Sequence, residues 1–331
     1  MLVVPGGKNL MKPILEVENL TKYFPVGKWN NKKEKGFIRA VDDVSFSMIK
    51  GETLGLVGES GCGKSTLGRV ILRLHQPTSG TIKVDGRDIT HLDHKELIYL
   101  RRRMQIVFQD PFGSLNPRLT IGKALAEPIK VHGLVKSQRE INEKVANLLT
   151  LVGLSPEHVR RYPHEFSGGQ RQRLVMARAL TMEPEIIVCD EPVSALDVSI
   201  QAQIINMLKE LQTKLGLTYI FIAHDLSVVK HISDRVAVMY LGKIVEIAPK
   251  RILYSDPLHP YTQSLLSAVP IPNPGAKKER ILLKGDVPSP LNPPSGCRFR
   301  TRCPKAFDRC EKEEPLLKSM PDERSAACHL L

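Results

Sequence analysis

The chain has 331 residues, and its 48 Lys and Arg outnumber its 35 Asp and Glu, which gives a formal net charge of +13 at pH 7. Hydrophobic residues make up 42% and charged residues 25%, which is ordinary for a globular protein and excludes a wholly disordered chain. No apolar run approaches the roughly 18 residues of a transmembrane helix, and the N-terminal residues lack the pattern of a secretory signal. The sequence therefore predicts a chain that stays in the cytosol.

The basic excess is dispersed along the chain. The longest run of consecutive Lys or Arg is Arg101–Arg103, and aromatic residues make up only 5% of the chain. Stacking surfaces for single-stranded nucleic acid are therefore not expected, and neither is direct binding of nucleic acid. A peripheral position beside an acidic membrane surface fits this charge distribution better.

Short apolar segments between helical patterns predict an α/β chain. Strands are expected at 15–19, 44–48, 53–57, 81–84, 186–189, 219–223 and 236–240. A helix is expected from about Lys64 to Leu74, and residues 93–165 show a mostly helical pattern. Another helix is indicated by apolar residues at spacings of four and three, namely Ile200, Ile204, Leu208, Leu211 and Leu215. Short strands between helices favour a parallel sheet with a helical insertion.

The composition changes in the last part of the chain. Seven prolines lie between Pro270 and Pro294, too many for a helix or a central strand. We therefore expect one large unit, 1–269, with a helical insertion at about 117–182. The remainder, 270–331, is expected to be an extended connection followed by a small region that carries cysteines.

A phosphate-binding motif follows the expected strand at 53–57. Residues 58–65 read Gly-Glu-Ser-Gly-Cys-Gly-Lys-Ser and match the pattern G-x-x-x-x-G-K-S/T between a strand and a helix. The glycines let successive backbone N–H groups face one centre, and the helix N-terminus adds partial positive charge there. We expect Lys64 to reach the β- and γ-phosphates and Ser65 to coordinate Mg²⁺. The nucleotide-binding residues predicted here are Gly58, Glu59, Ser60, Gly61, Cys62, Gly63, Lys64, Ser65 and Thr66.

Two carboxylates end the expected strand at 186–189. Asp190 stands where a Walker-B residue holds Mg²⁺, directly or through water. Glu191 is the candidate to orient and polarise the attacking water. An acidic pair after a strand can also be a helix cap or a solvated turn, but the phosphate-binding motif favours the catalytic interpretation.

Residues 166–170, Phe-Ser-Gly-Gly-Gln, lie between these two motifs and resemble the signature sequence of ABC-type ATPases. Further landmarks of that family occur in its order, at Tyr23, Gln109, residues 194–197 and His224. The match runs from about residue 14 to 250. The resemblance implies the P-loop α/β fold of an ABC ATPase with a helical subdomain, to which a small cysteine-bearing C-terminal extension is added.

The resemblance also implies a role for each landmark. Tyr23 stacks on the adenine of ATP, with Phe24 and Trp29 as rival candidates. Gln109 acts in catalysis and on Mg²⁺, and His224 contacts the γ-phosphate. These residues join Glu191 as catalytic candidates.

The signature turn implies a second ATPase. In the resembled family, the turn formed here by Ser167, Gly168, Gly169 and Gln170 contacts the γ-phosphate that the opposite subunit binds. Backbone N–H groups and a hydroxyl at a helix N-terminus suit such an anion. Because the chain has one such domain, two ATPase domains from different chains are expected to meet head to tail around ATP.

The sequence around the motifs narrows the family. Residues 109–118, 162–166 and 257–262 resemble ATP-binding subunits of bacterial oligopeptide and dipeptide permeases, most closely the F-type subunit, with the D-type possible. This implies a partner ATPase, two transmembrane permease subunits, an extracytoplasmic peptide-binding protein, and a place at the cytoplasmic face of the membrane. Residues 117–165 would dock on the permease.

The resemblance leaves the cargo open, because related importers carry nickel or glutathione and the ATPase does not touch the cargo. The rival class of function is a soluble ABC-type ATPase with a nucleic-acid or redox-sensing role.

Four of the six cysteines fall near the C-terminus, at Cys297, Cys303, Cys310 and Cys328. Their intervals of five, six and seventeen residues are not those of common zinc or ferredoxin sites, so a metal site and simple packing thiols both stay open. The permease family carries the same four cysteines, and some members hold a 4Fe–4S cluster there, which favours iron–sulfur over zinc. The neighbouring Arg298, Arg300, Arg302 and Arg309 would offset the cluster's negative charge or lie on a solvated surface.

Overall fold

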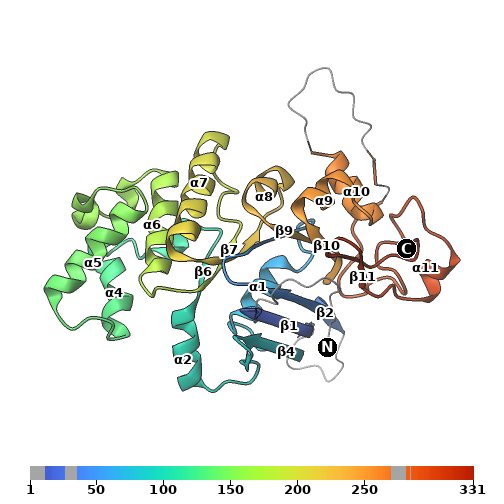
Figure 1. Ribbon diagram of the computed structural model, residues 1–331, viewed down its shortest axis with the longest axis horizontal. Helices are drawn as coiled ribbons and strands as arrows, with labels where there is room; N and C mark the ends of the chain where they lie inside the picture. The colour runs from blue at the N-terminus through green and yellow to red at the C-terminus, as the bar shows by residue number, and fades with distance from the viewer. Residues whose placement is uncertain (1–11, 27–35, 270–280, 284) are drawn as a thin grey trace.

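The computed structural model describes residues 12–26, 36–269, 281–283 and 285–331. Helices α4 (Ile121–Val131) and α5 (Gln138–Leu151) lie at one end of its long axis, and α11 (Asp308–Lys312) lies with the C-terminus at the other, as Figure 1 shows. The expected connection at 270–294 falls partly outside the described residues. In the described part of the chain, no helix has the length and apolar character needed to cross a membrane.

A mixed sheet forms the centre of the molecule. Within the described residues it has eight strands in the order β11-β12-β10-β9-β3-β8-β7-β6. In chain order they are β3 (Thr53–Val57), β6 (Met104–Val107), β7 (Ile186–Asp190), β8 (Thr218–Ile222), β9 (Arg235–Tyr240), β10 (Lys243–Pro249), β11 (Lys318–Met320) and β12 (Arg324–Ala326). Neighbours from β9 to β6 run parallel, whereas β10, β12 and β11 add antiparallel pairs at one edge.

Strands from the N-terminal part of the chain form a separate antiparallel sheet. Its order is β2-β1-β4-β5, with bounds β1 (Leu15–Pro25), β2 (Phe37–Met48), β4 (Ser79–Val84) and β5 (Arg87–Asp88). The sequence predicted three of these strands but placed no second sheet. Pairing between β1 and β4 joins segments more than 50 residues apart, for example Leu15 and Val84, and local periodicity carries no sign of it.

The remaining helices connect and cover the strands. They are α1 (Lys64–Ile71), α2 (His94–Arg103), α3 (Pro111–Ser114), α6 (Gly168–Leu180), α7 (Val198–Leu215), α8 (Leu226–Ile232), α9 (Lys250–Ser255) and α10 (Pro260–Ser267). Two short 3₁₀ helices, η1 (Pro156–Arg160) and η2 (Pro163–Glu165), precede α6. The expectation that residues 93–165 are mostly helical missed strand β6. Its four residues are too few to show an alternation of hydrophobic and polar residues, and pairing with β7 stabilises them.

Local chemistry explains where the principal helices begin and end. The Asp197 side chain accepts the Ile200 N–H at the start of α7, and Gly216 ends that helix with φ +66°. Ser167 and Gln170 cap the start of α6 reciprocally through side chain and backbone. Both signals were present in the sequence.

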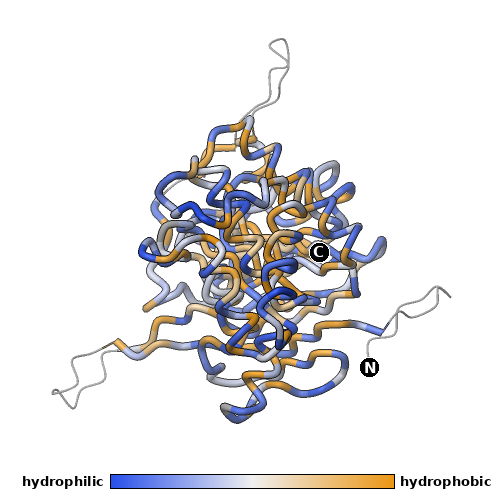
Figure 2. Tube along the Cα trace, turned by 90° about the vertical axis from the view of Figure 1, so that its left-hand side faces the viewer, coloured by the Kyte–Doolittle hydropathy of each residue, from blue (hydrophilic) through white to orange (hydrophobic). Residues whose placement is uncertain are grey.

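The main sheet separates two hydrophobic clusters. Tyr219 and Phe221 of β8 belong to the cluster on the side of α6 and α7, whereas Ile220 and Ile222 belong to the cluster on the side of α1 and the second sheet. This alternation arises because successive residues of a strand face opposite sides of a sheet. Figure 2 shows hydrophobic segments running through the middle of the molecule. The buried sheet is therefore a rigid support for the groups at its strand ends.

Candidate nucleotide-binding site

The predicted site residues gather where the central parallel strands end. The phosphate loop follows β3, Gln109 follows β6, and His224 follows β8. Asp190 is the last residue of β7, and Glu191 comes next. Because these strands are adjacent and parallel, their carboxyl ends meet at one edge, which is the usual ligand position in α/β sheets.

The phosphate loop needs glycine at two positions because other backbone atoms approach it closely there. A Cβ atom on Gly63 would lie 2.0 Å from the carbonyl oxygen of Ala40, and one on Gly58 would lie 2.2 Å from that of Met239. Both residues have positive φ, +109° and +152°. The loop is thus pressed against neighbouring strands in a shape that only glycine permits.

Lys64 is nearly fully buried, at 4% exposure, and its ammonium group is held by the loop itself. Its Nζ donates to the carbonyl oxygens of Gly58 at 2.8 Å and Glu59 at 3.0 Å. The positive charge therefore sits at the centre of the loop, where a phosphate group would compete for it.

Ser65 and Asp190 lie in direct contact beneath the loop. The Ser65 hydroxyl donates to Asp190 Oδ1 at 2.6 Å, and Arg69 lies 3.6 Å from Oδ2. A hydroxyl and a carboxylate side by side are the hard oxygen ligands that Mg²⁺ takes, so this pair fits the predicted metal.

Gln109, Glu191 and His224 come together from three strand ends. Gln109 Nε2 donates to Glu191 Oε2 at 2.9 Å, and His224 Nδ1 lies 3.5 Å from the same oxygen. Glu191 has φ +50°, an uncommon value for glutamate, and its backbone is fixed by bonds to Ile222 and Ser194. The three predicted catalytic side chains are therefore one contiguous group around a single carboxylate.

Tyr23 of β1 is tied to a residue that the sequence analysis missed. Its hydroxyl donates to Asp42 Oδ1 at 2.7 Å. Burial and this bond raise the pKa of Tyr23 to about 12. Burial alone would raise the pKa of Asp42, but the Tyr23 hydroxyl and the Arg298 guanidinium outweigh burial and lower it. The tyrosine ring is thereby held in one orientation beneath Arg39, which lies 5.8 Å from the ring centroid.

The rival aromatics are placed differently. Phe24 packs edge-on against His75, with ring centroids 5.6 Å apart. Trp29 lies outside the described residues.

The signature turn is open to solvent. Ser167 and Gly168 are exposed at the start of α6. The Ser167 hydroxyl accepts the Gln170 N–H at 3.3 Å, and the Gln170 side chain accepts the Ser167 N–H at 3.1 Å. Gly169 packs close to α7, since a Cβ there would lie 2.5 Å from Ile200. The turn is an ordered polar surface that faces away from the protein interior.

The structure does not support the predicted iron–sulfur site at the C-terminal cysteines. Among the described residues, no three His, Cys, Asp or Glu side chains are grouped closely enough to hold a metal ion. Cys297 and Cys303 pack against the main hydrophobic cluster, Cys310 is buried, and Cys328 is half-buried. Burial raises the pKa of Cys297 to about 11, and the neighbouring thiols of Cys310, Cys328 and Cys303 act in the same direction. The burial of these thiols fits packing residues, and the structure gives no support for a 4Fe–4S cluster.

Comparison with known proteins decides the family. Residues 41–194 match the family model described as ABC transporter, and residues 245–310 match the one described as oligopeptide/dipeptide transporter, C-terminal region. The oligopeptide transport ATP-binding protein AppF of Bacillus subtilis is 56% identical over 320 residues, which cover 96% of this chain and 97% of AppF. The chain belongs to the ATP-binding proteins of ABC transporters.

Further relatives agree with this assignment of the ABC ATPase. The probable peptide ABC transporter ATP-binding protein y4tS of Sinorhizobium fredii is 55% identical, over 96% of this chain and 90% of that protein. Among solved structures, the ATP-binding cassette MJ0796, a dimer bound to ADP and phosphate, superposes with a TM-score of 0.64 at 30% identity, covering 72% of this chain and 99% of that one. As a member of the family, this ABC ATPase is an ATP hydrolase and a subunit of a transporter complex.

Proposed function

We propose that this ABC ATPase hydrolyses ATP to drive import of di- or oligopeptides through a membrane permease complex. One observation carries the proposal. The phosphate loop, the Ser65–Asp190 pair and the Gln109–Glu191–His224 group lie together at one edge of the sheet. Relatives named for oligopeptide transport support peptides over nickel or glutathione as cargo. The chain would work at the cytoplasmic face of the membrane.

Each side chain has a proposed part in hydrolysis. Lys64 turns from the loop carbonyls to the β- and γ-phosphates, while Ser65 and Asp190 hold Mg²⁺. When bound, that ion offsets phosphate charge and orients the γ-phosphate for in-line attack. Glu191 accepts a hydrogen bond from the attacking water and orients it, and His224 lies beside it to contact the γ-phosphate. Gln109 holds the Glu191 carboxylate in place.

A second ATPase completes the site. The exposed turn of Ser167, Gly168 and Gly169 offers a hydroxyl and N–H groups to a γ-phosphate bound on a partner chain. The dimer described for MJ0796 supports this arrangement. We propose a heterodimer with a second ABC ATPase of the same transporter.

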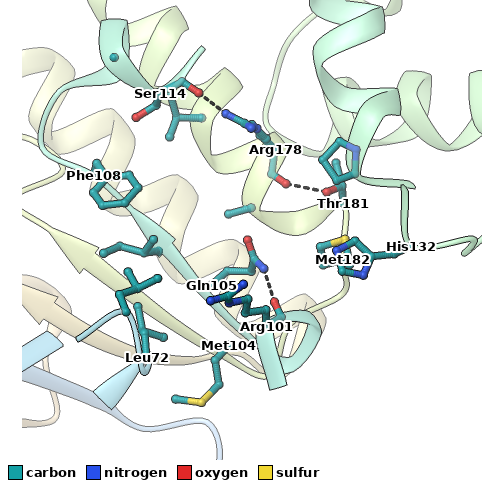
Figure 3. Close-up of a pocket in the computed structure, with 16 residues that line it drawn as sticks. Leu72, Arg101, Met104, Gln105, Phe108, Ser114, His132, Arg178, Thr181 and Met182 are labelled. Atoms are coloured by element: carbon teal, nitrogen blue, oxygen red, sulfur yellow. Dashed lines mark hydrogen bonds between the residues drawn. The ribbon is translucent and has the colours of Figure 1, made fainter. Parts of the chain in front are cut away.

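A cavity of about 400 Å³ offers a docking place for the permease. It lies between β6, α4 and α6, so the main sheet and the helical insertion share its walls, as Figure 3 shows. Apolar Leu74 and Phe108 are partly exposed at this cavity, and Arg101 and Arg178 also line it. These features suit a short amphipathic segment with acidic groups from a permease subunit. A movement of the helical insertion on ATP binding would then be transmitted directly to the permease segment bound in the cavity.

The remaining partners and boundaries follow from the same proposal. Two permease subunits would bind an ATPase pair, and an extracytoplasmic peptide-binding protein would act through the permease. Residues 1–269 would form the ATPase unit, with its helical insertion at about 117–182, and 270–331 the connection and cysteine-bearing extension.

The test is recovery of the tagged chain from gently solubilised native membranes, with partners identified by mass spectrometry. We expect a second ATPase and two multi-span proteins. Leu74→Asp, at the cavity, should lose the permease subunits and still bind ATP, whereas Tyr99→Asp, exposed on α2 and not lining the cavity, should keep them. Recovery without membrane partners but with nucleic acid would contradict the proposal.

A further inference from the structure

The C-terminal extension, residues 285–331, packs onto the ATPase fold beside the phosphate loop. Its strand β12 pairs with β10, and Arg39 of β2 donates its N–H to the Pro290 carbonyl oxygen at 3.1 Å. Phe299 is 1% exposed and lies against Tyr240 and Tyr261, with ring centroids 5.3 Å away in both cases. This aromatic contact fixes a short segment of the extension, from Cys297 to Cys303, at the rim of the nucleotide-binding site.

One arginine of that segment reaches the phosphate loop. Arg302 Nη1 donates to Glu59 Oε2 at 2.7 Å and Nη2 to Oε1 at 3.0 Å, a two-pronged pair in which the arginine side chain is 9% exposed. The Glu59 N–H donates to the buried Tyr261 hydroxyl at 2.9 Å. The second residue of the phosphate loop is therefore held at both its backbone and its side chain by residues outside the loop.

A second arginine reaches the adenine side of the site. Arg298, 6% exposed, forms an ion pair with Asp42, and it also donates to the Leu241 carbonyl oxygen. The other oxygen of the Asp42 carboxylate accepts the Tyr23 hydroxyl at 2.7 Å. A continuous chain of contacts thus links the extension to the predicted adenine-stacking ring.

The charges in this network matter for an anionic ligand. Without Arg302, the Glu59 carboxylate would stand unpaired in a loop that must accept a triphosphate, and like charges repel. Without Arg298, the nearly buried Asp42 carboxylate would have to rearrange, and the Tyr23 hydroxyl would follow it. Both arginines neutralise a carboxylate that also fixes part of the nucleotide site.

We propose that Arg298 and Arg302 are positioning residues of the ATP site. Arg302 holds the phosphate loop through Glu59, and Arg298 holds Tyr23 through Asp42. The extension is then part of the nucleotide-binding unit and not an appendage to it. This inference rests on the proposed roles of Tyr23 and the phosphate loop.

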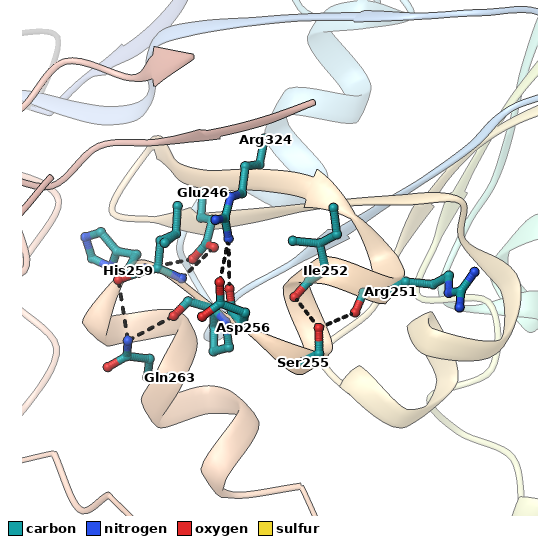
Figure 4. Close-up of polar contacts among 10 residues, drawn as sticks. Glu246, Arg251, Ile252, Ser255, Asp256, His259, Gln263 and Arg324 are labelled. Carbon is teal, nitrogen blue, oxygen red and sulfur yellow. Dashed lines mark hydrogen bonds and ion pairs between the residues drawn. The ribbon is translucent and has the colours of Figure 1, made fainter. Parts of the chain in front are cut away.

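The chain supplies a matched control for simple anchoring. Arg324 also ties the extension to the ATPase fold, through Asp256 Oδ2 at 2.9 Å, with the arginine side chain 16% exposed. Figure 4 shows this pair beside Glu246 and His259. Arg324 Nη1 donates to the carboxylate and to the carbonyl oxygen of Asp256, which belongs to neither the phosphate loop nor β1. Loss of Arg324 should therefore weaken attachment of the extension without changing the nucleotide site.

The experiment measures equilibrium binding of MgATP and of magnesium tripolyphosphate, which carries phosphates but no base, to the full-length chain. Arg302→Met should weaken both probes about tenfold, since a hydrogen-bonded charge at the loop is lost. Arg298→Met should weaken ATP by about the same factor and leave tripolyphosphate unchanged. Arg324→Met should bind both probes like the wild type while its unfolding temperature falls.

Two outcomes overturn the inference: both arginine variants bind ATP like the wild type, or Arg324→Met weakens ATP as strongly as they do. A wild-type chain that binds neither probe would contradict the proposed function itself. If Arg302→Met does not fold, the double variant Arg302→Met with Glu59→Gln leaves no unpaired charge at the contact. That variant should still bind tripolyphosphate more weakly than the wild type, and wild-type affinity would again contradict the inference.

Discussion

The catalytic group at the sheet edge and the arginine pair of the C-terminal extension differ in how far solvent reaches their side chains. At the edge, the His224 side chain is 59% exposed and Glu191 stays within reach of a ligand. In the extension, Arg298 and Phe299 are almost completely buried, and the arginine is paired with a carboxylate. Groups that act on a substrate need access, whereas groups that fix geometry need burial and partners. The accessible His224 and Glu191 thus suit a chemical role, and the buried Arg298 suits a positioning role.

The largest expected effect lies at the catalytic edge, with Glu191→Gln. The amide keeps the shape and the contact to Gln109 but cannot act as a base, so ATP binding should persist while turnover falls about 100-fold or more. Steady-state hydrolysis and nucleotide binding of the assembled transporter measure this. Glu210→Gln, on the exposed face of α7, is the matched control and should hydrolyse ATP normally. Equal turnover in the two variants would remove Glu191 from its role.

A second prediction concerns the loop between the two regions. Gly63→Ala places a Cβ 2.0 Å from the Ala40 carbonyl oxygen, so we expect loss of ATP binding and a cost of about 3 kcal/mol or more. Gly61→Ala, in the same loop, meets nothing within 4 Å and should cost only about 1–2 kcal/mol for its positive φ. Denaturant unfolding of both variants checks the difference. Equal losses would show that backbone crowding does not set the loop's shape.

A third prediction concerns how the stability of the folded chain depends on pH. His259 is 1% exposed, its Nδ1 accepts the Tyr261 N–H at 3.0 Å, and burial lowers its pKa to about 4. Below pH 6.5 the unfolded chain binds a proton that the folded chain does not, so stability falls as pH falls from 6.5 towards 4. Between pH 7 and pH 5 this histidine should cost about 2 kcal/mol of unfolding free energy.

His259→Asn tests that assignment, because asparagine also caps a helix start but does not titrate. The loss of stability between pH 7 and pH 5 should shrink by about 2 kcal/mol in this variant, measured by urea unfolding at each pH. The same change at the exposed His91 should leave the loss unaltered. A wild-type pH dependence in His259→Asn would place the titrating group elsewhere.

Prediction from sequence located structure where the signal is local. The phosphate loop lies between the expected strand and the expected helix, and the acidic pair comes at the end of an expected strand. Each of these signals spans only a few residues, so the order of residues in the chain indicates the structure. Strand β6 was missed because four residues show no period, and the second sheet was missed because β1 and β4 meet across distant segments.

The extension shows why long-range contacts escape sequence patterns. Arg298 and Asp42 are 256 residues apart, and nothing in their spacing predicts that they meet. The basic residues near the cysteines were expected to offset a cluster or lie on the surface. Instead, the buried Arg298 and the half-buried Arg302 pair with carboxylates of the ATPase fold. The iron–sulfur prediction finds no support in the structure, and spacing alone does not distinguish a packing thiol from a metal ligand. Analysis of iron and acid-labile sulfide in anaerobic protein tests them directly.

The most direct test of the whole account is ATP-driven uptake of a labelled oligopeptide by proteoliposomes that contain the complete transporter. With the wild-type chain, uptake should require MgATP on the cytoplasmic side, and with Glu191→Gln it should stop although the complex still assembles and binds ATP. Uptake that proceeds unchanged with Glu191→Gln, or a complex that moves nickel or glutathione and no peptide, would contradict it.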